Sequence, residues 1–196
     1  MQRVAGQLRF SPSDLGDFVA CEHLTQLELA MAMSGGARPA GENAFAELLQ
    51  RKGEAHELAY LQSLRERGHA VVEVRLGEAR DWEAAARATE DAMRGGAEYI
   101  YQAVLLDGAW RGIADFLERV DTPSSLGTWS YVVLDTKLAR RPKPEHGLQL
   151  CFYSQALGRV QGFEPEAAYV VLGTRERFRI RLADVSAYYR RVRRRF

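Results

Sequence analysis

The chain has 196 residues, of which 46% are hydrophobic and 27% are charged, and its formal net charge is +1. This composition excludes a disordered chain and is typical of one globular domain, with or without an added lobe. The near-neutral total neither supports nor excludes a nucleic-acid partner, because a local basic groove can coexist with a small net charge.

The amino-terminal segment predicts a helix that runs from residue 11 to the Gly35–Gly36 pair, with Ser13 as its N-cap. Apolar residues at helical spacing would form its buried stripe: Leu15, Phe18, Val19, Leu24, Leu27 and Met31. The first residues lack the apolar stretch of a signal peptide, and no apolar run is long enough to span a bilayer. We therefore expect an N-terminal helical segment over residues 1–41, packed on the core of a soluble, cytoplasmic protein without a membrane anchor.

The middle of the chain predicts a helix, a strand and a second helix. After the loop at residues 36–41, residues 42–68 have a helical pattern that contains an internal glycine, Gly53, which suggests a packing or functional reason for it. Residues 69–76 alternate as a strand does. A helix capped by Asp81 follows and ends at a Gly-Gly pair.

The second half of the chain predicts a hairpin and then a strand–helix–strand unit. Apolar runs at residues 98–106 and 110–120 flank an Asp-Gly turn, which is a strong hairpin signal. A strand is expected at 129–138, a helix at 144–162, strands at 166–172 and 177–182, and a closing helix at 183–196. This order predicts an α/β (α+β) protein with a mixed sheet, because the hairpin is antiparallel and the crossover is parallel.

The closing helix contains the basic run "YYRRVRRRF", which is compatible with a solvated face or with a phosphate-facing surface. The chain stops inside this helix, as the front part of a longer protein would. The two cysteines, Cys21 and Cys151, lack disulfide or zinc-finger spacing, which fits a reducing compartment.

The stretch "YVVLDTKLAR" places Asp135 and Lys137 on one face at the end of a predicted strand. Only three of the 27 basic residues of the chain are lysines, so a lysine at this place is distinctive. Lysine is a compact charge whose pKa can shift, whereas arginine is a planar group that stays protonated. Alone, an Asp-x-Lys pair is more often an ion pair at a strand end than a site.

Asp115 lies in the most apolar part of the preceding strand, between Ala114 and Phe116. If the two strands pair, Asp115 and Asp135 can converge, and two close carboxylates need a cation, a shared proton or water. Oxygen ligands suit Mg²⁺ or Mn²⁺. His56, on the helix over 42–68, could complete such a metal site, although a lone histidine is more often structural.

Two polar side chains on the next predicted helix, Gln149 and Tyr153, are four residues apart and therefore share a face. They are either ordinary positions of a half-buried helix or a polar pair at the mouth of the site that touches the substrate.

The ordered motifs "GEAHEL", "GIAD", "LDTK" and "QLCFY" resemble the RecB-like branch of the PD-(D/E)XK nuclease family. The resemblance covers residues 42–172 and implies a restriction-endonuclease-like αβββαβ core within residues 42–196. It also implies that His56, Asp115, Asp135 and the carbonyl of Thr136 bind Mg²⁺ or Mn²⁺. Lys137 would then position the attacking water, with Asp115, Asp135 and Lys137 as the catalytic set. Gln149 and Tyr153 would support the site or contact the strand.

The amino-terminal segment resembles RecB-like nucleases that carry an iron–sulfur cluster, including CRISPR-associated ones. Their cluster needs four cysteines, so none is expected with the two present here, and we expect Cys21 to be a buried core thiol. The relatives imply a neighbouring RNase H-like or helicase region, which this chain does not contain.

The hypothesis that follows is a metal-dependent DNA nuclease that acts on single strands or ends in DNA repair, recombination or defence. One alternative is a nucleic-acid-binding or scaffolding module of a larger nuclease or helicase, without turnover of its own. Another is a small-molecule phosphoesterase, which the lack of a glycine-rich phosphate loop disfavours.

Overall fold

The structure is a computed structural model, and it describes residues 1–4, 6–35, 44–78 and 80–196. The predicted loop at 36–41 and the proposed domain boundary at 41/42 lie outside the described residues. The elements are β1 (Gln2–Val4), β2 (Gln7–Arg9), α1 (Pro12–Ala20), α2 (Glu22–Ser34), α3 (Ala44–Glu66), β3 (Val71–Glu73), α4 (Trp82–Arg94), β4 (Tyr99–Asp107), β5 (Trp110–Val120), β6 (Ser130–Lys137), α5 (Pro144–Gln161), β7 (Ala167–Leu172), β8 (Arg177–Arg181) and α6 (Ala183–Arg195).

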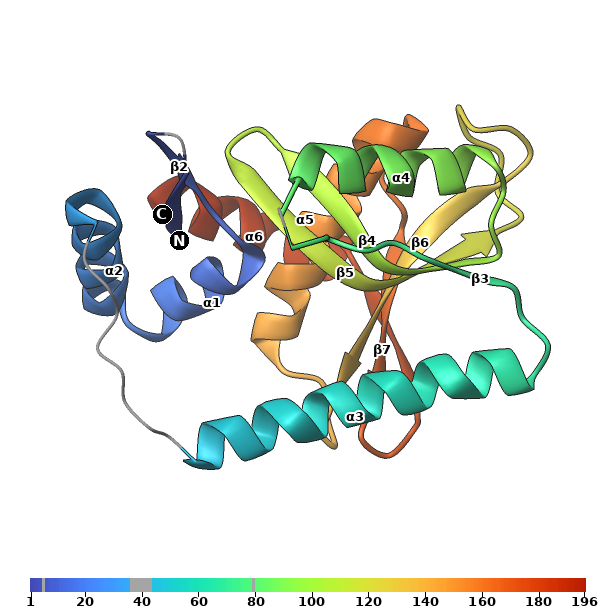
Figure 1. The fold of residues 1–196 in the computed structure, drawn as a ribbon, viewed down its shortest axis with the longest axis horizontal. Helices are drawn as coiled ribbons and strands as arrows, with labels where there is room; N and C mark the ends of the chain where they lie inside the picture. The colour runs from blue at the N-terminus through green and yellow to red at the C-terminus, as the bar shows by residue number, and fades with distance from the viewer. Residues whose placement is uncertain (5, 36–43, 79) are drawn as a thin grey trace.

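A six-stranded mixed sheet in the order β3-β4-β5-β6-β7-β8 forms the centre of the molecule (Figure 1). The strands β4, β5 and β6 form an antiparallel meander, and β6 runs parallel to β7 across the α5 crossover. This confirms the predicted hairpin and the predicted parallel unit. The series α3, β4, β5, β6, α5, β7 is the expected αβββαβ core, with β3 and α4 inserted after α3.

Helices cover both faces of the sheet. On one face, Phe116 and Leu134 pack with Leu61 and Leu64 of α3. On the other face, Leu117 and neighbouring strand residues pack with α4 and α5 in the larger core. In Figure 1, α3 lies along one side of the sheet and α4 along the opposite side. Both faces of β5 and β6 are thus buried, and polar side chains on these strands have few routes to solvent.

The end of the β4–β5 hairpin anchors the two last helices. Asp107 is buried, and its carboxylate forms ion pairs with Arg159 of α5 and Arg193 of α6. Arg193 also lies over the Trp110 ring, with 5.2 Å from its Cζ to the ring centroid. At least part of the basic run in the closing helix therefore points inward, and Arg195 pairs with Glu22 of α2. Among the described residues, no helix is both long and apolar enough to cross a membrane.

The predicted helix from residue 11 to Gly35 is in fact two helices, and that prediction was wrong in the middle. Cys21 is extended (φ −161°) between α1 and α2, and helix propensity is a weak preference that tertiary packing overrides. The N-cap is Ser11 rather than Ser13. Pro12 fits the first helical position, where no backbone N–H is needed. The Ser11 N–H donates to Asp14 Oδ2 at 2.8 Å, as in a capping box.

The break between α1 and α2 changes what the N-terminal segment buries. Leu15 is fully buried, but Val19, Leu24 and Leu27 of the predicted stripe are exposed by 47%, 42% and 49%. Cys21 is exposed, so the expectation of a buried core thiol was also wrong, whereas Cys151 is buried. In a continuous helix, the whole apolar stripe would face the core. Because the helix is broken, Leu15 of α1 faces the core, whereas Leu24 and Leu27 of α2 do not.

His146 at the start of α5 is expected to make the stability of the protein pH-dependent. Its Nδ1 accepts the Lys143 N–H at 3.2 Å, and burial is the main cause that lowers the pKa of His146 to about 4. Because the unfolded chain binds the proton near pH 6.5, folding stability is complete above that pH and is lost as the pH falls towards 4. At about 1.4 kcal/mol per pKa unit, the loss amounts to about 3 kcal/mol.

Urea unfolding at pH 7 and pH 5 measures this loss. His146→Gln is the matched variant, because glutamine at the third helical position caps the same N–H but does not titrate. The variant should lose much less stability between the two pH values, and an equal loss in both proteins contradicts the assignment.

Candidate active site

The Asp-x-Lys stretch lies at the end of β6, where the strand leaves the sheet for α5. Asp135 is fully buried (0% exposed), whereas the Lys137 side chain is 27% exposed. The two side chains share a face as predicted, and Lys137 Nζ lies 2.7 Å from Asp135 Oδ2. The strand therefore buries a carboxylate and leaves the lysine at the rim of the site.

Asp115 on β5 lies where the ladder between β5 and β6 ends. The last paired residues are Phe116 and Leu134. They are the immediate neighbours of Asp115 and Asp135 along their strands. Beyond that pair, Asp115 Oδ2 takes the place of a backbone acceptor: it receives the Thr136 N–H and the Thr136 Oγ1–H, both at 2.7 Å. The predicted pairing of the two strands is thus confirmed, and the two strands open into a fork that holds both aspartates.

The charges of the fork are strongly coupled. Burial, and then the negative charge of Asp115, raise the pKa of Asp135 to about 7, although Lys137 opposes this shift. Burial works against the charged form of Lys137, but Asp135 and Asp115 outweigh it and raise the pKa of the ammonium group. The lysine is therefore charged near neutral pH, and the carboxylates are in electrostatic conflict.

Glu57 on α3 is a third acid at this place that the sequence reasoning missed. Burial, and then Asp115, raise the pKa of Glu57, while hydrogen bonds from Tyr101 and Gln102 oppose the shift. Gln102 Nε2 donates to Glu57 Oε1. The motif "GEAHEL" contains this residue next to His56, and a helical wheel of α3 aligned on the apolar positions Leu61 and Leu64 would have been needed to select it.

His56 lies against β7 rather than between the aspartates. Its Nε2 is 3.2 Å from the carbonyl oxygen of Val171, the residue that pairs with Thr136 across the sheet. Among the described residues, His56, Asp115 and Asp135 do not form a set whose ligand atoms all lie within 4.8 Å of one another. The role of His56 as a metal ligand stays a prediction.

The chemistry of the fork fits a hard divalent cation. Among the described residues, neither oxygen of the buried Asp135 carboxylate has a well-directed hydrogen-bond donor, although Lys137 is close to one of them. An unsatisfied buried carboxylate is costly, and a second carboxylate beside it adds repulsion. Oxygen-coordinated Mg²⁺ or Mn²⁺ would relieve both costs, with Asp135, Asp115 and Glu57 as the acids at hand. Among the described residues, the ligand atoms of these three acids also do not all lie within 4.8 Å of one another.

Gln149 and Tyr153 of α5 differ in exposure. Tyr153 is 3% exposed, its hydroxyl donates to the Ile113 carbonyl oxygen at 2.7 Å, and burial raises its pKa well above the ordinary value. These contacts favour a supporting role for Tyr153 beneath β5. Gln149 is half-buried and lines two surface cavities, one of which also contains Tyr153 and the other Lys137. Contact of Gln149 with a substrate stays a prediction.

The close approach of Tyr153 to β5 requires glycine at position 112. A Cβ atom there would lie 2.7 Å from Tyr153 Cε1 and 3.1 Å from Pro12 Cδ. We expect Gly112→Ala to destabilise the protein by about 1–3 kcal/mol through overpacking and to reduce activity by shifting the strand that carries Asp115.

The matched control is Gly53→Ala on α3, where an added Cβ meets none of the described atoms within 4 Å. A packing reason for Gly53, one of the two that we considered, is therefore not supported. Gly53→Ala should raise the free energy of unfolding by up to about 1 kcal/mol, because alanine favours a helix more than glycine does. Urea unfolding of both variants measures the contrast, and equal stabilities argue against a packed Gly112–Tyr153 contact.

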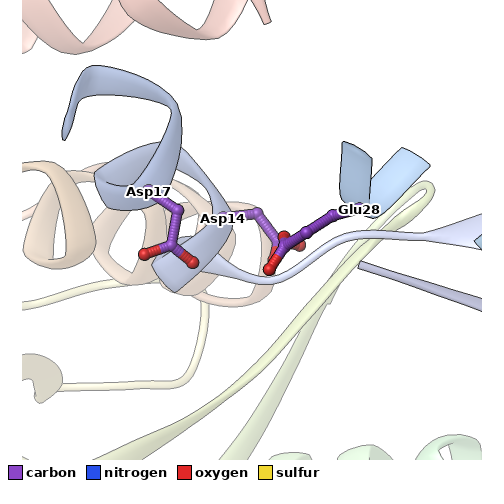
Figure 2. Close-up of side chains that lie close together, drawn as sticks. All are labelled: Asp14, Asp17 and Glu28. Carbon is purple, nitrogen blue, oxygen red and sulfur yellow. The ribbon is translucent and has the colours of Figure 1, made fainter. Parts of the chain in front are cut away.

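A second acidic group lies apart from the fork, on α1 and α2. Figure 2 shows Asp14, Asp17 and Glu28 close together, and their ligand atoms all lie within 4.8 Å of one another. Asp14 already receives the Met1 ammonium group at 2.7 Å and the Ser11 N–H at 2.8 Å. This group is therefore at least partly neutralised by the protein itself, and we do not assign it a metal.

Comparison with known proteins matches the chain to one family. Residues 9–194 match the family model of the PD-(D/E)XK nuclease superfamily, which covers the sheet, the fork and most of α6. No curated protein matches the chain. The match is at the level of the superfamily, so the RecB-like branch stays a prediction.

Proposed function

This chain belongs to the PD-(D/E)XK nuclease superfamily, and from that membership we propose that it is a Mg²⁺- or Mn²⁺-dependent DNA nuclease that cleaves single strands or ends. The observation that carries the proposal is the fork of β5 and β6. It brings together in one site a fully buried carboxylate that lacks a well-directed hydrogen-bond donor among the described residues, a second carboxylate and a charged lysine.

The acids of the fork would hold the ion. Asp135 and Asp115 are the central ligands, with the Thr136 carbonyl and His56 as further ligands implied by the RecB-like resemblance and Glu57 added by the structure. A bound divalent ion polarises the scissile phosphate and lowers the pKa of a water molecule. Asp115 is held in place by its two hydrogen bonds to Thr136, so β5 and β6 keep the ligands in register.

Lys137 would act as a positioned cation rather than as a base. Because nearby carboxylates raise its pKa, its ammonium group keeps its proton near neutral pH. At the rim of the site it can donate to a water molecule or to the phosphate and offset the negative charge that grows on the phosphate. A compact ammonium group fits beside Asp135 Oδ2 at 2.7 Å, where a planar guanidinium would need more room.

The biological setting that we propose is DNA repair, recombination or defence in the cytoplasm. It follows from the RecB-like resemblance and from a DNA substrate. A neighbouring RNase H-like or helicase region, in this protein or in a partner, would supply substrate strands.

A cleavage assay on labelled single-stranded DNA with Mn²⁺ tests the function. The wild type should cleave, and an Asp135→Ala, Lys137→Ala double variant should not. If the wild type does no more than the double variant, the nuclease proposal fails. Salt-dependent DNA binding without cleavage would then favour the binding-module alternative.

A further inference from the structure

Three arginines from distant parts of the chain gather on one side of the molecule. Arg9 ends β2, Arg80 precedes α4, and Arg111 lies near the start of β5. All three line one surface cavity of about 630 Å³. We call Arg9, Arg80 and Arg111 the arginine cluster.

No ion pair between the described residues neutralises the positive charges of the cluster. Among the described residues, none of the three guanidinium groups lies within 4.0 Å of a carboxylate. Burial, and then the charges of Arg9 and Arg80, lower the pKa of Arg111, and the more weakly acting Glu83 does not reverse this. Like charges that are held together without a partner favour an anion between them.

Neutral contacts hold two of the three arginines, Arg111 and Arg9, in place. Arg111 Nη2 donates to Gln2 Oε1 at 2.7 Å, and Arg111 Cζ lies 4.4 Å from the centroid of the Trp82 ring. Arg9 Nη1 donates to the Gly108 carbonyl oxygen at 3.3 Å. Each guanidinium has five N–H donors, so these contacts leave donors for an anionic ligand.

The cavity of the cluster continues into the candidate active site. A neighbouring cavity of about 580 Å³ contains Lys137, and the two cavities share the lining residues Pro12, Ser13, Asp17 and Gln149. A route thus runs from Lys137 past Gln149 to the arginine cluster. Arg111 is four residues before Asp115 on β5, or about 14 Å at 3.4 Å per residue.

Three acids line the two cavities: Asp14 and Asp17 line the cavity of the cluster, and Asp17 and Glu145 line the cavity that contains Lys137. Asp14 lines the cavity of the cluster, but its carboxylate receives the Met1 ammonium group at 2.7 Å and the Ser11 N–H at 2.8 Å. Its charge is therefore offset by the protein. The cluster brings three positive charges to the cavity that it shares with Asp14 and Asp17, so basic groups outnumber the acids there.

We propose that the arginine cluster binds the phosphodiester backbone of the single-stranded DNA substrate, a few nucleotides from the scissile phosphate. The inference rests on the proposed nuclease function and adds the path of the strand over the surface. Arginine suits this task because its planar fork binds phosphate in a bidentate manner.

The test measures binding and cleavage separately. Fluorescence anisotropy with a labelled single strand of about ten nucleotides, in EDTA so that no cleavage occurs, gives the dissociation constant at several salt concentrations. The variant is Arg9→Ala, Arg80→Ala, which spares the more deeply held Arg111. The matched control is Arg67→Ala, Arg179→Ala. It removes two exposed arginines that do not line the cavity of the cluster, one directly after the C-terminal end of α3 and one on β8.

We expect the cluster variant to bind at least about tenfold more weakly. The slope of log K against log salt should become shallower by about 1.4, or about 0.7 for each phosphate that the variant no longer neutralises, and the control should match the wild type. In Mn²⁺, the wild type should show a lower KM for strands of about ten nucleotides than for strands of about three, and the cluster variant should not show this preference.

The outcomes separate the two proposals. Wild-type cleavage with an unchanged salt slope in the cluster variant overturns the strand path and leaves the nuclease function intact. A cluster-dependent slope without any metal-dependent cleavage overturns the nuclease function and supports the path. A wild type that neither binds nor cleaves overturns both.

Discussion

Lys137→Arg should reduce the rate of DNA cleavage by at least about 100-fold, although it keeps the positive charge. Lys137 Nζ lies 2.7 Å from Asp135 Oδ2 at the rim of the fork. A guanidinium group is larger and planar, so it cannot place a single donor at the same point. We therefore expect kcat to fall while the affinity for DNA, measured in EDTA, changes little.

The matched control for this variant is Lys52→Arg. Lys52 is exposed on α3, and the same exchange there should leave kcat unchanged. Full activity of Lys137→Arg would show that position 137 supplies only charge, and the positioning role would have to be abandoned. Loss of DNA binding equal to the loss of kcat would instead assign Lys137 to substrate affinity.

Asp135→Asn should stabilise the metal-free protein at pH 8 and abolish both metal binding and cleavage. Asp135 is fully buried beside Asp115, and burial followed by that neighbour raises its pKa to about 7, against about 3.9 for an unperturbed aspartate. Between about pH 4 and 7, Asp135 keeps its proton in the folded protein but has lost it in the unfolded chain. The contribution of Asp135 to stability is therefore greatest below pH 4 and is lost as the pH rises through 7.

The full difference corresponds to about 4 kcal/mol at 1.36 kcal/mol per pKa unit. An asparagine recovers only part of it, since it loses the ion pair with Lys137 and buries an amide. We expect a gain of about 1–3 kcal/mol in the free energy of unfolding, measured by urea unfolding in EDTA at pH 8. At pH 5 the gain should shrink, because the wild-type aspartate is then largely protonated.

Metal addition tests the other part of this prediction, the loss of metal binding in Asp135→Asn. Mg²⁺ or Mn²⁺ at 100 times its dissociation constant should stabilise the wild type by about 2.7 kcal/mol and leave Asp135→Asn unchanged. Asp91→Asn, an exposed change on α4, is the control that should behave like the wild type in both experiments. Equal stabilisation of Asp135→Asn by metal would move the metal site away from the fork.

The sequence predicted the core of the fold well where hydrophobic period and turn chemistry agree. The hairpin around Asp107-Gly108, the strand that ends at Lys137 and the helix that begins at Pro144 all lie within a few residues of their predicted places. The pattern was less informative at the amino end. There, the apolar spacing of residues 11–35 fitted one helix, and nothing local indicated that Cys21 would be extended.

The residues of the candidate site also divide into those that the local sequence identifies and those that only the packing of the helix identifies. Asp115, Asp135 and Lys137 were selected from strand period and apolar context, which depend on local sequence. His56 and Glu57 are adjacent on α3, and the choice between them depends on how that helix is rotated against the sheet. In the structure Glu57 feels the charge of Asp115, whereas His56 faces the Val171 carbonyl.

The arginine cluster shows the limit most clearly. Arg9, Arg80 and Arg111 belong to three segments without a common motif. The sequence alone drew attention only to the basic run of the closing helix, as either a solvated face or a phosphate-facing surface. The sequence by itself determined the mixed sheet and its Asp-x-Lys strand, because periodicity and turns are local properties of the chain. Only the tertiary structure decided which acids and arginines share a space, because that depends on the packing of segments about 100 residues apart along the chain, such as Arg9 and Arg111.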